Sequence, residues 1–176
     1  FETRSLAAVA LIMTSGLEVS QASVHVTDGY HDMGIDAIYL DEIQKKLFIV
    51  QSKWRSDGIG SITQDEMSNF VQGIQRVLEE DLAGSNAKIM AKSIDIDVAL
   101  TQMGYQIHAG NQNANEYVLR PISKLMEKTN DEISTILLFD ELNFKDIYTF
   151  LANGQEQLGI NIDDVILSNW GKVDVP

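Results

Sequence analysis

The chain opens with apolar residues at helical spacing and continues with residues that alternate as in a strand. The helical pattern is carried by Leu6, Val9, Ala10 and Met13. It predicts a helix over residues 2–15 with one buried stripe. In residues 23–27, Val alternates with polar side chains, which predicts a short strand leading into an acidic loop.

Two further apolar runs predict a β-hairpin within residues 35–53. The first run ends at Leu40 and the second begins at Leu47, and the residues between them read Asp-Glu-Ile-Gln-Lys-Lys. This polar link is suited to turning the chain back, so the two strands should pair in a register that the loop sets. The hairpin then places Asp36 at the start of one strand and Gln51-Ser52-Lys53 at the end of the other.

Beyond residue 60, helical and strand patterns alternate. Thr63 and Glu66 have the spacing of a capping box, and the apolar stripe that follows predicts a helix reaching Leu78. Residues 86–101 fit a strand or a helix, and we favour the helix. The remaining expected elements are strands at 105–109, 133–139 and 165–167 and helices at 115–128 and 144–151. This order predicts an α/β fold with a mixed β-sheet flanked by helices.

Length and composition limit the domain organisation and the location of the protein. The 176 residues suffice for one domain with a substantial core, expected over 1–159, with 160–176 leading into a C-terminal region. The sequence opens inside a predicted helix and ends just after an apolar stretch, so we expect it to be part of a longer protein with further C-terminal domains. The absence of cysteine agrees with a cytoplasmic location. The longest apolar run, 6–13, is too short to span a bilayer, so no membrane partner is expected.

The end of the hairpin carries the strongest chemical signal. Side chains alternate along a strand, so Gln51 and Lys53 share a face, and Asp36 should lie at the same end of the sheet. A carboxylate and an amide oxygen are ligands that a hard cation prefers, and an ammonium beside them can act on an attacking water. This set of groups is typical of metal-assisted phosphodiester cleavage.

The same residues carry a resemblance to a known superfamily. The chain resembles the PD-(D/E)xK restriction-endonuclease-like nucleases in their Gln-x-Lys, Mrr-type form. Within residues 1–56 it is most similar to the N-terminal nuclease domain of abortive-infection phage-resistance proteins of the AIPR type. The matching segments are Phe1-Glu2, Thr27-Asp28-Gly29, Asp32-x-Gly34-Ile35-Asp36 and Gln51-Ser52-Lys53. The chain departs from the superfamily pattern in having Gln51 where an acid is usual, which removes one negative ligand.

The resemblance implies a restriction-endonuclease-like core and an endodeoxyribonuclease that uses Mg²⁺ or Mn²⁺ in phage defence. Asp36 would bind the metal directly, and Lys53 would orient or deprotonate the attacking water. The expected further ligands are the Gln51 amide oxygen, the Ser52 backbone carbonyl, Glu2 and Asp32. DNA is the expected partner, while RNA as a substrate and a homodimer as the assembly are left open.

Other interpretations of these residues stay open at the level of sequence. Glu2 is also the acid that a helix favours in its first turn, and Asp28 and Asp32 also suit turns. The formal net charge of −13 argues against a broad basic surface for nucleic acid. A nuclease-fold module that binds nucleic acid or a protein without cutting is therefore the main alternative, and a plain interaction domain is a third.

Overall fold

The computed structural model describes residues 2–53, 61–112, 114–142, 146–147 and 149–150, with only the backbone described at Glu2 and Gln112. The chain divides into two compact units, Phe1–Leu142 and Asn143–Pro176. The predicted domain boundary at residue 159 lies outside the described residues and stays a prediction. None of the described helices is both long and apolar enough to cross a membrane.

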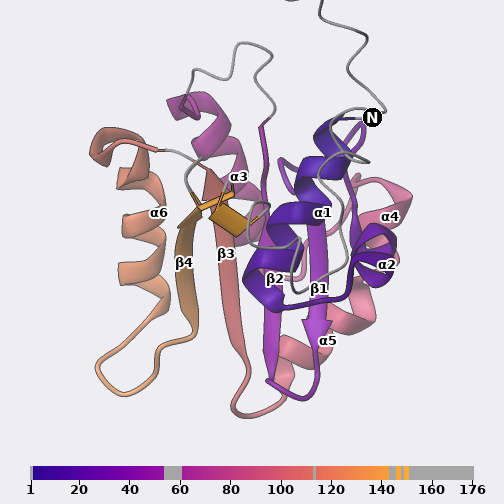
Figure 1. Cartoon of the computed structure of the whole chain (residues 1–176). Coiled ribbons are helices and arrows are strands. Elements are labelled where there is room, and N and C mark those ends of the chain that lie inside the picture. The colour runs from indigo at the N-terminus through magenta and orange to yellow at the C-terminus, as the bar shows by residue number, and fades with distance from the viewer. Residues whose placement is uncertain (1, 54–60, 113, 143–145, 148, 151–176) are drawn as a thin grey trace, which may run out of the picture. The chain divides into compact units, whose positions relative to one another are not determined.

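The first unit contains a four-stranded sheet with helices on both faces (Figure 1). The strands are β1 (Ala37–Asp41), β2 (Lys46–Val50), β3 (Gln106–Gln112) and β4 (Leu137–Leu142). The helices are α1 (Glu2–Ser15), α2 (Val19–Ala22), the 3₁₀ turn η1 (Ser23–His25), α3 (Gln64–Leu78), α4 (Ala87–Met90), α5 (Ser93–Thr101) and α6 (Glu116–Thr129). The α/β class and the mixed, helix-flanked sheet are therefore as predicted.

The strands lie in the order β1-β2-β3-β4. β1 and β2 form the predicted antiparallel hairpin, in which Ala37 pairs with Val50. β2, β3 and β4 run parallel to one another. The start of β1 and the carboxyl ends of the other three strands therefore share one edge of the sheet, which we call the carboxyl edge. The residues before Ala37 and those after Val50 both lie there.

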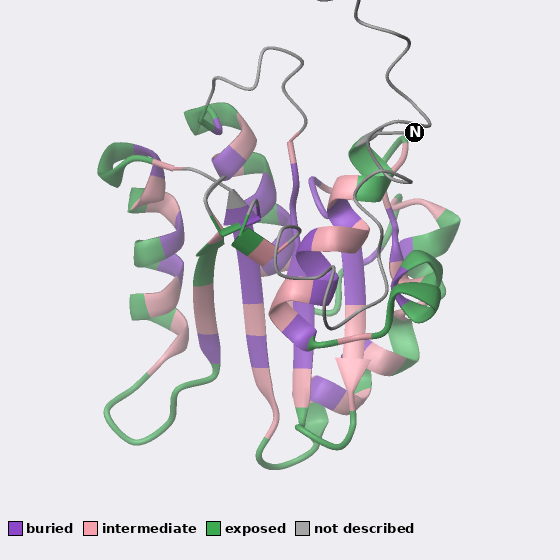
Figure 2. Ribbon diagram, in the orientation of Figure 1, coloured by how far each residue is buried: buried purple, intermediate pink, exposed green. Residues whose placement is uncertain are grey.

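Side chains along the hairpin point alternately to the two faces of the sheet, and each face packs in its own apolar core. Figure 2 shows that the central strands are largely buried. Ile38, Leu47 and Ile49 face α3, α5 and α6, where the larger core lies. Phe48 and Val50 face α1 in the smaller core. Covering both faces of the central strands explains why β2 reads as a continuous apolar run.

The α1 helix is where predicted, but its buried stripe is rotated by about one residue. The buried positions are Ala7, Ala10, Leu11 and Ile12, while Leu6, Val9 and Met13 are only partly buried. Ala7, Ala10 and Leu11 pack in the smaller core against the sheet. Leu6, Val9 and Met13 lie towards the sides of the helix. One turn before Ala7, the same stripe continues to Thr3, whereas a stripe through Leu6 would continue to Glu2.

The strand predicted over 23–27 is wrong. The η1 turn, which directly follows α2, occupies residues 23–25, and within this segment only Val26 forms an isolated bridge, to Ala37. Val24 is 73% exposed, so the alternation that suggested a strand reflects no sheet face. The turn is held instead by His25, whose ring contacts Tyr39 at 4.7 Å between centroids and whose Nδ1 lies 2.9 Å from Lys92 Nζ.

Most later elements follow the prediction. Thr63 and Glu66 form the predicted capping box at the start of α3, and residues 86–101 hold two helices instead of a strand. β4 begins four residues later than the predicted 133–139 strand, because the Asp131 side chain accepts hydrogen bonds from the backbone N–H groups of Ile133 and Ser134 and holds a turn there. Much of the predicted helix at 144–151 and the whole strand at 165–167 lie outside the described residues.

Helix α3 packs directly against the loop that precedes β1. A Cβ atom built at Gly73 would lie 2.2 Å from the backbone oxygen of Met33 and 3.2 Å from atoms of Ile35. Real Cβ atoms do not approach other atoms that closely, so only glycine allows this contact. The acidic loop and α3 are consequently held at a fixed distance.

We expect Gly73→Ala to lower the free energy of unfolding by about 1–3 kcal/mol, because the added methyl group must push the loop away from α3. Helix propensity alone predicts the opposite, a gain of about 0.8–1.0 kcal/mol for alanine over glycine. Urea unfolding of the wild type, Gly73→Ala and the exposed neighbouring control Gln72→Ala measures the difference. A Gly73→Ala protein as stable as the wild type would contradict the close contact.

Candidate functional site

Backbone pairing at the carboxyl edge brings the two ends of the hairpin together. The N–H of Asp36 donates to the oxygen of Val50 at 2.8 Å, and the N–H of Gln51 donates to the oxygen of Gly110 at 3.0 Å. Backbone hydrogen bonding thus begins one residue before β1, at Asp36, and continues one residue after β2, at Gln51. Continued by one residue, the register of Ala37 with Val50 places Asp36 opposite Gln51, and Ser52 is the next residue along the chain.

Asp36 is the most deeply buried acid of this edge, with 3% of its surface exposed. Its Oδ2 accepts hydrogen bonds from the Ser52 N–H at 2.6 Å and from the Ser52 hydroxyl at 3.3 Å. Burial raises the pKa of Asp36 from 3.8 to about 6, although the Ser52 N–H and the charge of Lys53 act in the opposite direction. The negative charges of Asp32 and Asp28 add to the rise. A positive charge at this position would offset that cost.

Three carboxylates meet at this point. Asp28, Asp32 and Asp36 each offer an oxygen, and these oxygens lie within 4.8 Å of one another. We call these residues the aspartate cluster. Hard divalent cations such as Mg²⁺ and Mn²⁺ prefer carboxylate oxygens, so the chemistry of the donor set fits the predicted metal.

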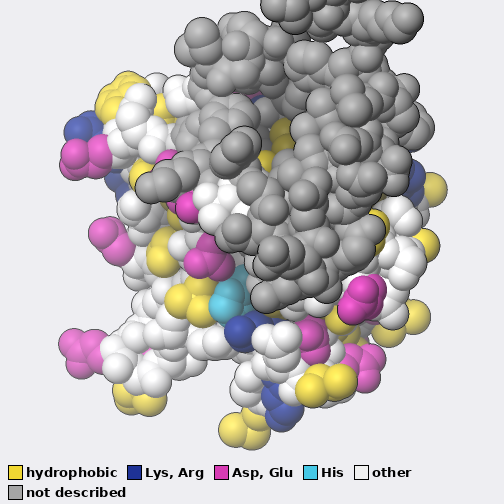
Figure 3. Space-filling view, viewed as in Figure 1, with side chains coloured by type: hydrophobic (Ala, Val, Ile, Leu, Met, Phe, Trp, Pro, Cys, Tyr) yellow, Lys and Arg dark blue, Asp and Glu magenta, His cyan; other side chains and the backbone are white. Residues whose placement is uncertain are grey.

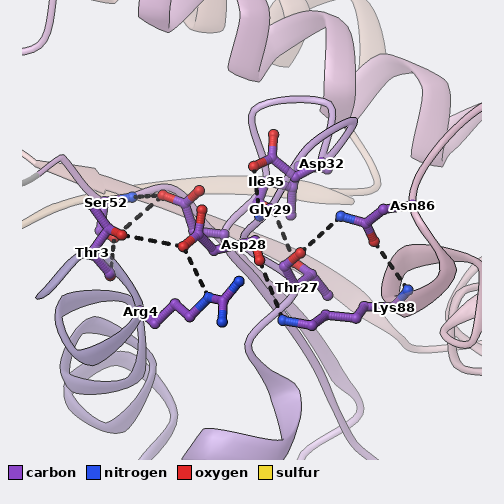
Figure 4. A network of polar contacts seen from close by, with 11 residues as sticks. Thr3, Arg4, Thr27, Asp28, Gly29, Asp32, Ile35, Ser52, Asn86 and Lys88 are labelled. Atoms are coloured by element: carbon purple, nitrogen blue, oxygen red, sulfur yellow. Dashed lines mark hydrogen bonds and ion pairs between the residues drawn. The ribbon is translucent and has the colours of Figure 1, made fainter. Parts of the chain in front are cut away.

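The first turn of α1 holds Asp28 (Figure 4). The Thr3 hydroxyl donates to Asp28 Oδ2 at 3.2 Å, and Arg4 Nε lies 3.5 Å from the same oxygen. The Thr3 backbone oxygen also accepts a hydrogen bond from the Ser52 hydroxyl at 3.4 Å. The first turn of α1 therefore brings Thr3 and Arg4 to the cluster.

Asp32 organises the loop that carries it. Its Oδ1 accepts from the Gly34 N–H at 2.8 Å and its Oδ2 accepts from the Gly29 N–H at 3.1 Å. The turn-forming interpretation of Asp32 is thus confirmed. Each carboxylate oxygen can accept more than one bond, so the predicted role as a ligand is compatible with this turn.

Asn86, the residue that caps α4, closes the loop from the other side. Its Nδ2 donates to the Thr27 oxygen at 3.0 Å, its backbone N–H donates to the His31 oxygen at 3.0 Å, and its Oδ1 caps the helix. Lys88, in the same helix, reaches the Asp28 backbone oxygen at 3.2 Å (Figure 4). The three aspartates are therefore held by elements on both sides of the loop.

Gln51 lies at the same edge, but its amide bonds to other groups than the aspartate cluster. Its Nε2 donates to the backbone oxygen of Gly34 at 2.9 Å and weakly to that of Glu66 at 3.5 Å. Its Oε1 accepts a hydrogen bond of 2.7 Å from Asn111 Nδ2. The use of this oxygen as a metal ligand, as the resemblance implies, stays a prediction.

The other predicted residues are placed in part. Lys53 is half-buried and lies close enough to lower the pKa of Asp36. Ser52 contacts Asp36 through its N–H and hydroxyl groups, while ligation by its carbonyl stays a prediction. The Glu2 side chain lies outside the described residues.

Four residues of this edge escaped the sequence interpretation. The sequence suggests a turn-forming role for Asp28. The regular spacing of the aspartates at 28, 32 and 36 is the signal that could have grouped it with the other two. Thr3 and Arg4 would follow from the correct phase of α1. No local sequence pattern identifies Asn111 as a site residue. It contacts Gln51 only because β3 pairs in parallel with β2.

A cavity of about 680 Å³ lies at the other end of the sheet, near the start of β3. Its walls include Leu78, Leu100, Tyr105 and Leu125, and none of the predicted site residues line it. The cavity and the aspartate cluster are therefore separate features.

Comparison of the chain with protein-family models, with curated proteins and with solved structures found no match. The resemblance to restriction-endonuclease-like nucleases thus continues to depend on the motif residues alone.

Proposed function

We propose that this protein is a divalent-metal-dependent nuclease with a restriction-endonuclease-like core, which hydrolyses DNA phosphodiester bonds in phage defence. The main support is one observation: the buried carboxylate of Asp36 lies among the oxygens of Asp28 and Asp32 and within electrostatic reach of Lys53. Buried acids with raised pKa values next to a lysine are characteristic of functional sites. The assignment to phage defence depends on the motif resemblance.

In this proposal Asp28, Asp32 and Asp36 hold Mg²⁺ or Mn²⁺ through their carboxylate oxygens. A bound divalent cation supplies a Lewis acid and lowers the pKa of a coordinated water. The Lys53 ammonium orients the attacking water and stabilises negative charge that develops on the phosphate. The Ser52 N–H fixes the Asp36 carboxylate so that it needs little reorganisation when a cation binds.

Cationic groups next to the cluster support a phosphate-containing substrate. Arg4 and Lys88 both contact Asp28, and Lys53 interacts with Asp36. Figure 3 shows acidic side chains on the described part of one face, in agreement with the net charge of −13. Positive charge thus lies beside the proposed metal ligands, while the net charge of the chain would repel nucleic acid.

The second candidate is a module of the same fold that binds nucleic acid or a protein without cutting. The position of Gln51 favours it, because this residue replaces the usual acid and its amide is bonded to Gly34 and Asn111. The two candidates differ in whether cleavage depends on a metal.

Nicking of supercoiled plasmid DNA by the full chain in Mg²⁺ or Mn²⁺ tests the proposal. We expect metal-dependent nicking that EDTA stops and that the doubly substituted Asp36→Asn, Lys53→Ala protein lacks. The double variant, purified in the same way, measures contaminating nuclease. Equal nicking by both proteins, or none by the wild type in either metal, would reject the enzyme in favour of the binding module. A labelled RNA of matched length in parallel reactions decides the substrate class.

A further inference from the structure

We propose that Gln51 is a positioning residue and not a metal ligand, and that Asn111, Gln51 and Gly34 form a chain of hydrogen bonds that holds the aspartate cluster in shape. The inference depends on the proposed metal site and changes its composition. It assigns a role to Asn111, which lies at the end of β3 far from the motif residues in sequence.

The orientation of the Gln51 amide is fixed by its surroundings. Gln51 and Asn111 are both 1% exposed. One end of the Gln51 amide faces two backbone oxygens, those of Gly34 and Glu66, and must therefore be the NH₂ group. The other end is then the oxygen, which accepts the 2.7 Å bond from Asn111 Nδ2. The amide thus uses its donor and acceptor groups within the protein.

Gly34 connects this amide to the cluster. Its oxygen accepts from Gln51 Nε2, and its N–H donates to Asp32 Oδ1 at 2.8 Å. Its φ is +71°, and a Cβ atom at this position would lie 2.8 Å from Asn69 Nδ2, so the position is restricted to glycine. A shift of the Gln51 amide would therefore move Gly34, the residue whose N–H binds Asp32 and which lies two residues before Asp36.

At its other end, this chain of hydrogen bonds is fixed to the carboxyl edge of the sheet. The Gln51 N–H donates to the oxygen of Gly110, and Asn111 follows Gly110 in β3. The side-chain bond between Asn111 and Gln51 thus reinforces a backbone bond between the same two strands. Buried polar groups with satisfied bonds of this kind specify one arrangement, because losing a partner leaves a desolvated polar atom.

Gln51→Glu separates positioning from ligation. A glutamate at a ligand position adds a negative charge and should strengthen cation binding. If residue 51 instead positions the loop, a glutamate there cannot donate to the Gly34 and Glu66 oxygens. Its carboxylate would then face two acceptors and displace the loop that carries Asp32. The two roles therefore predict opposite changes in metal affinity.

The experiment is a calorimetric titration of Mn²⁺ into the full chain at pH 7.5. The variants are Gln51→Glu, Asn111→Ala and the charge-matched control Gln72→Glu on the exposed side of α3. We expect Gln51→Glu and Asn111→Ala to weaken Mn²⁺ binding about 10–100-fold, as the loss of groups that orient ligands commonly does. Gln72→Glu should leave the affinity nearly unchanged. Equal or tighter binding by Gln51→Glu would overturn the proposal.

A second measurement keeps the inference testable if the metal proposal fails or if Gln51→Glu does not fold. In protein labelled with ¹⁵N-glycine, Asn111→Ala should shift the Gly34 amide signal and leave that of Gly84 in place. A wild type that binds no Mn²⁺ rejects the metal site alone, and the Gly34 signal then decides the positioning role. An unshifted Gly34 signal in folded Asn111→Ala rejects that role whatever the metal does.

Discussion

Replacing Asp36 with asparagine should abolish cation binding and cleavage while stabilising the metal-free fold at neutral pH. The pKa of Asp36 is raised from 3.8 to about 6 chiefly by burial, so the folded protein binds this proton more tightly than the unfolded chain. The free energy of unfolding therefore falls as the pH rises from 3.8 to 6, by about 3 kcal/mol in all. Asparagine can accept the Ser52 hydrogen bond without a charge, so the variant avoids this loss.

Urea unfolding without metal, at pH 4.5 and at pH 8, measures the effect. We expect Asp36→Asn to be more stable than the wild type at pH 8, and this advantage to shrink towards zero at pH 4.5. The control is Asp97→Asn, which removes an exposed acid from α5 and should change stability little at either pH. A variant less stable than the wild type at pH 8 would show that the ionised carboxylate stabilises the fold.

Replacing Lys53 with alanine should slow cleavage greatly without loss of the metal. This change removes the ammonium and keeps all three aspartates, so Mn²⁺ should bind as tightly as before or more tightly. Cleavage should fall by about 10²–10⁴-fold, the usual cost of losing a proton-transfer or charge-stabilising group. Single-turnover cleavage of plasmid DNA at saturating Mn²⁺ separates this loss from any change in binding.

Lys124→Ala, which removes an exposed lysine from α6, is the matched control for net charge. It should cleave at the wild-type rate. Comparable cleavage by both lysine variants would contradict the role proposed for Lys53, and a loss of Mn²⁺ binding in Lys53→Ala would show that the lysine acts on the fold of the site.

The parts of the fold that the sequence predicts well are those decided by neighbouring residues. The hairpin and its register follow from two apolar runs and a polar link, and the start of α3 follows from the capping box of Thr63 and Glu66. The phase of α1 could not be read from apolar spacing, because the helix packs through Ala7, Ala10 and Leu11, while the equally apolar Leu6, Val9 and Met13 are only partly buried. The η1 turn was missed because His25 is held by Lys92, a distant residue.

In the candidate site too, contacts set by neighbouring residues could be predicted, and contacts between distant segments could not. The meeting of Asp36 with the segment from Gln51 to Lys53 follows from the hairpin register, and the sequence predicts it. The hydrogen bond from the Ser52 N–H to Asp36 comes from the structure. The bond from Asn111 to Gln51 requires β3 to lie parallel to β2, an arrangement that no local pattern encodes. The ligand role predicted for Gln51 was inferred from the alternation of side chains along its own strand alone. The structure shows that its amide also bonds to Gly34 and Asn111 on neighbouring segments.

The local origin of the hairpin has a consequence for the order of folding. Asp28, Asp32, Asp36 and Ser52 belong to one continuous stretch of chain, so closing the loop that joins them costs little entropy. β3 joins β2 only across a long parallel connection, which is intrinsically slow to form. We therefore expect the acids to come together early along the folding route, and the bond from Asn111 to Gln51 to close late, when β3 docks.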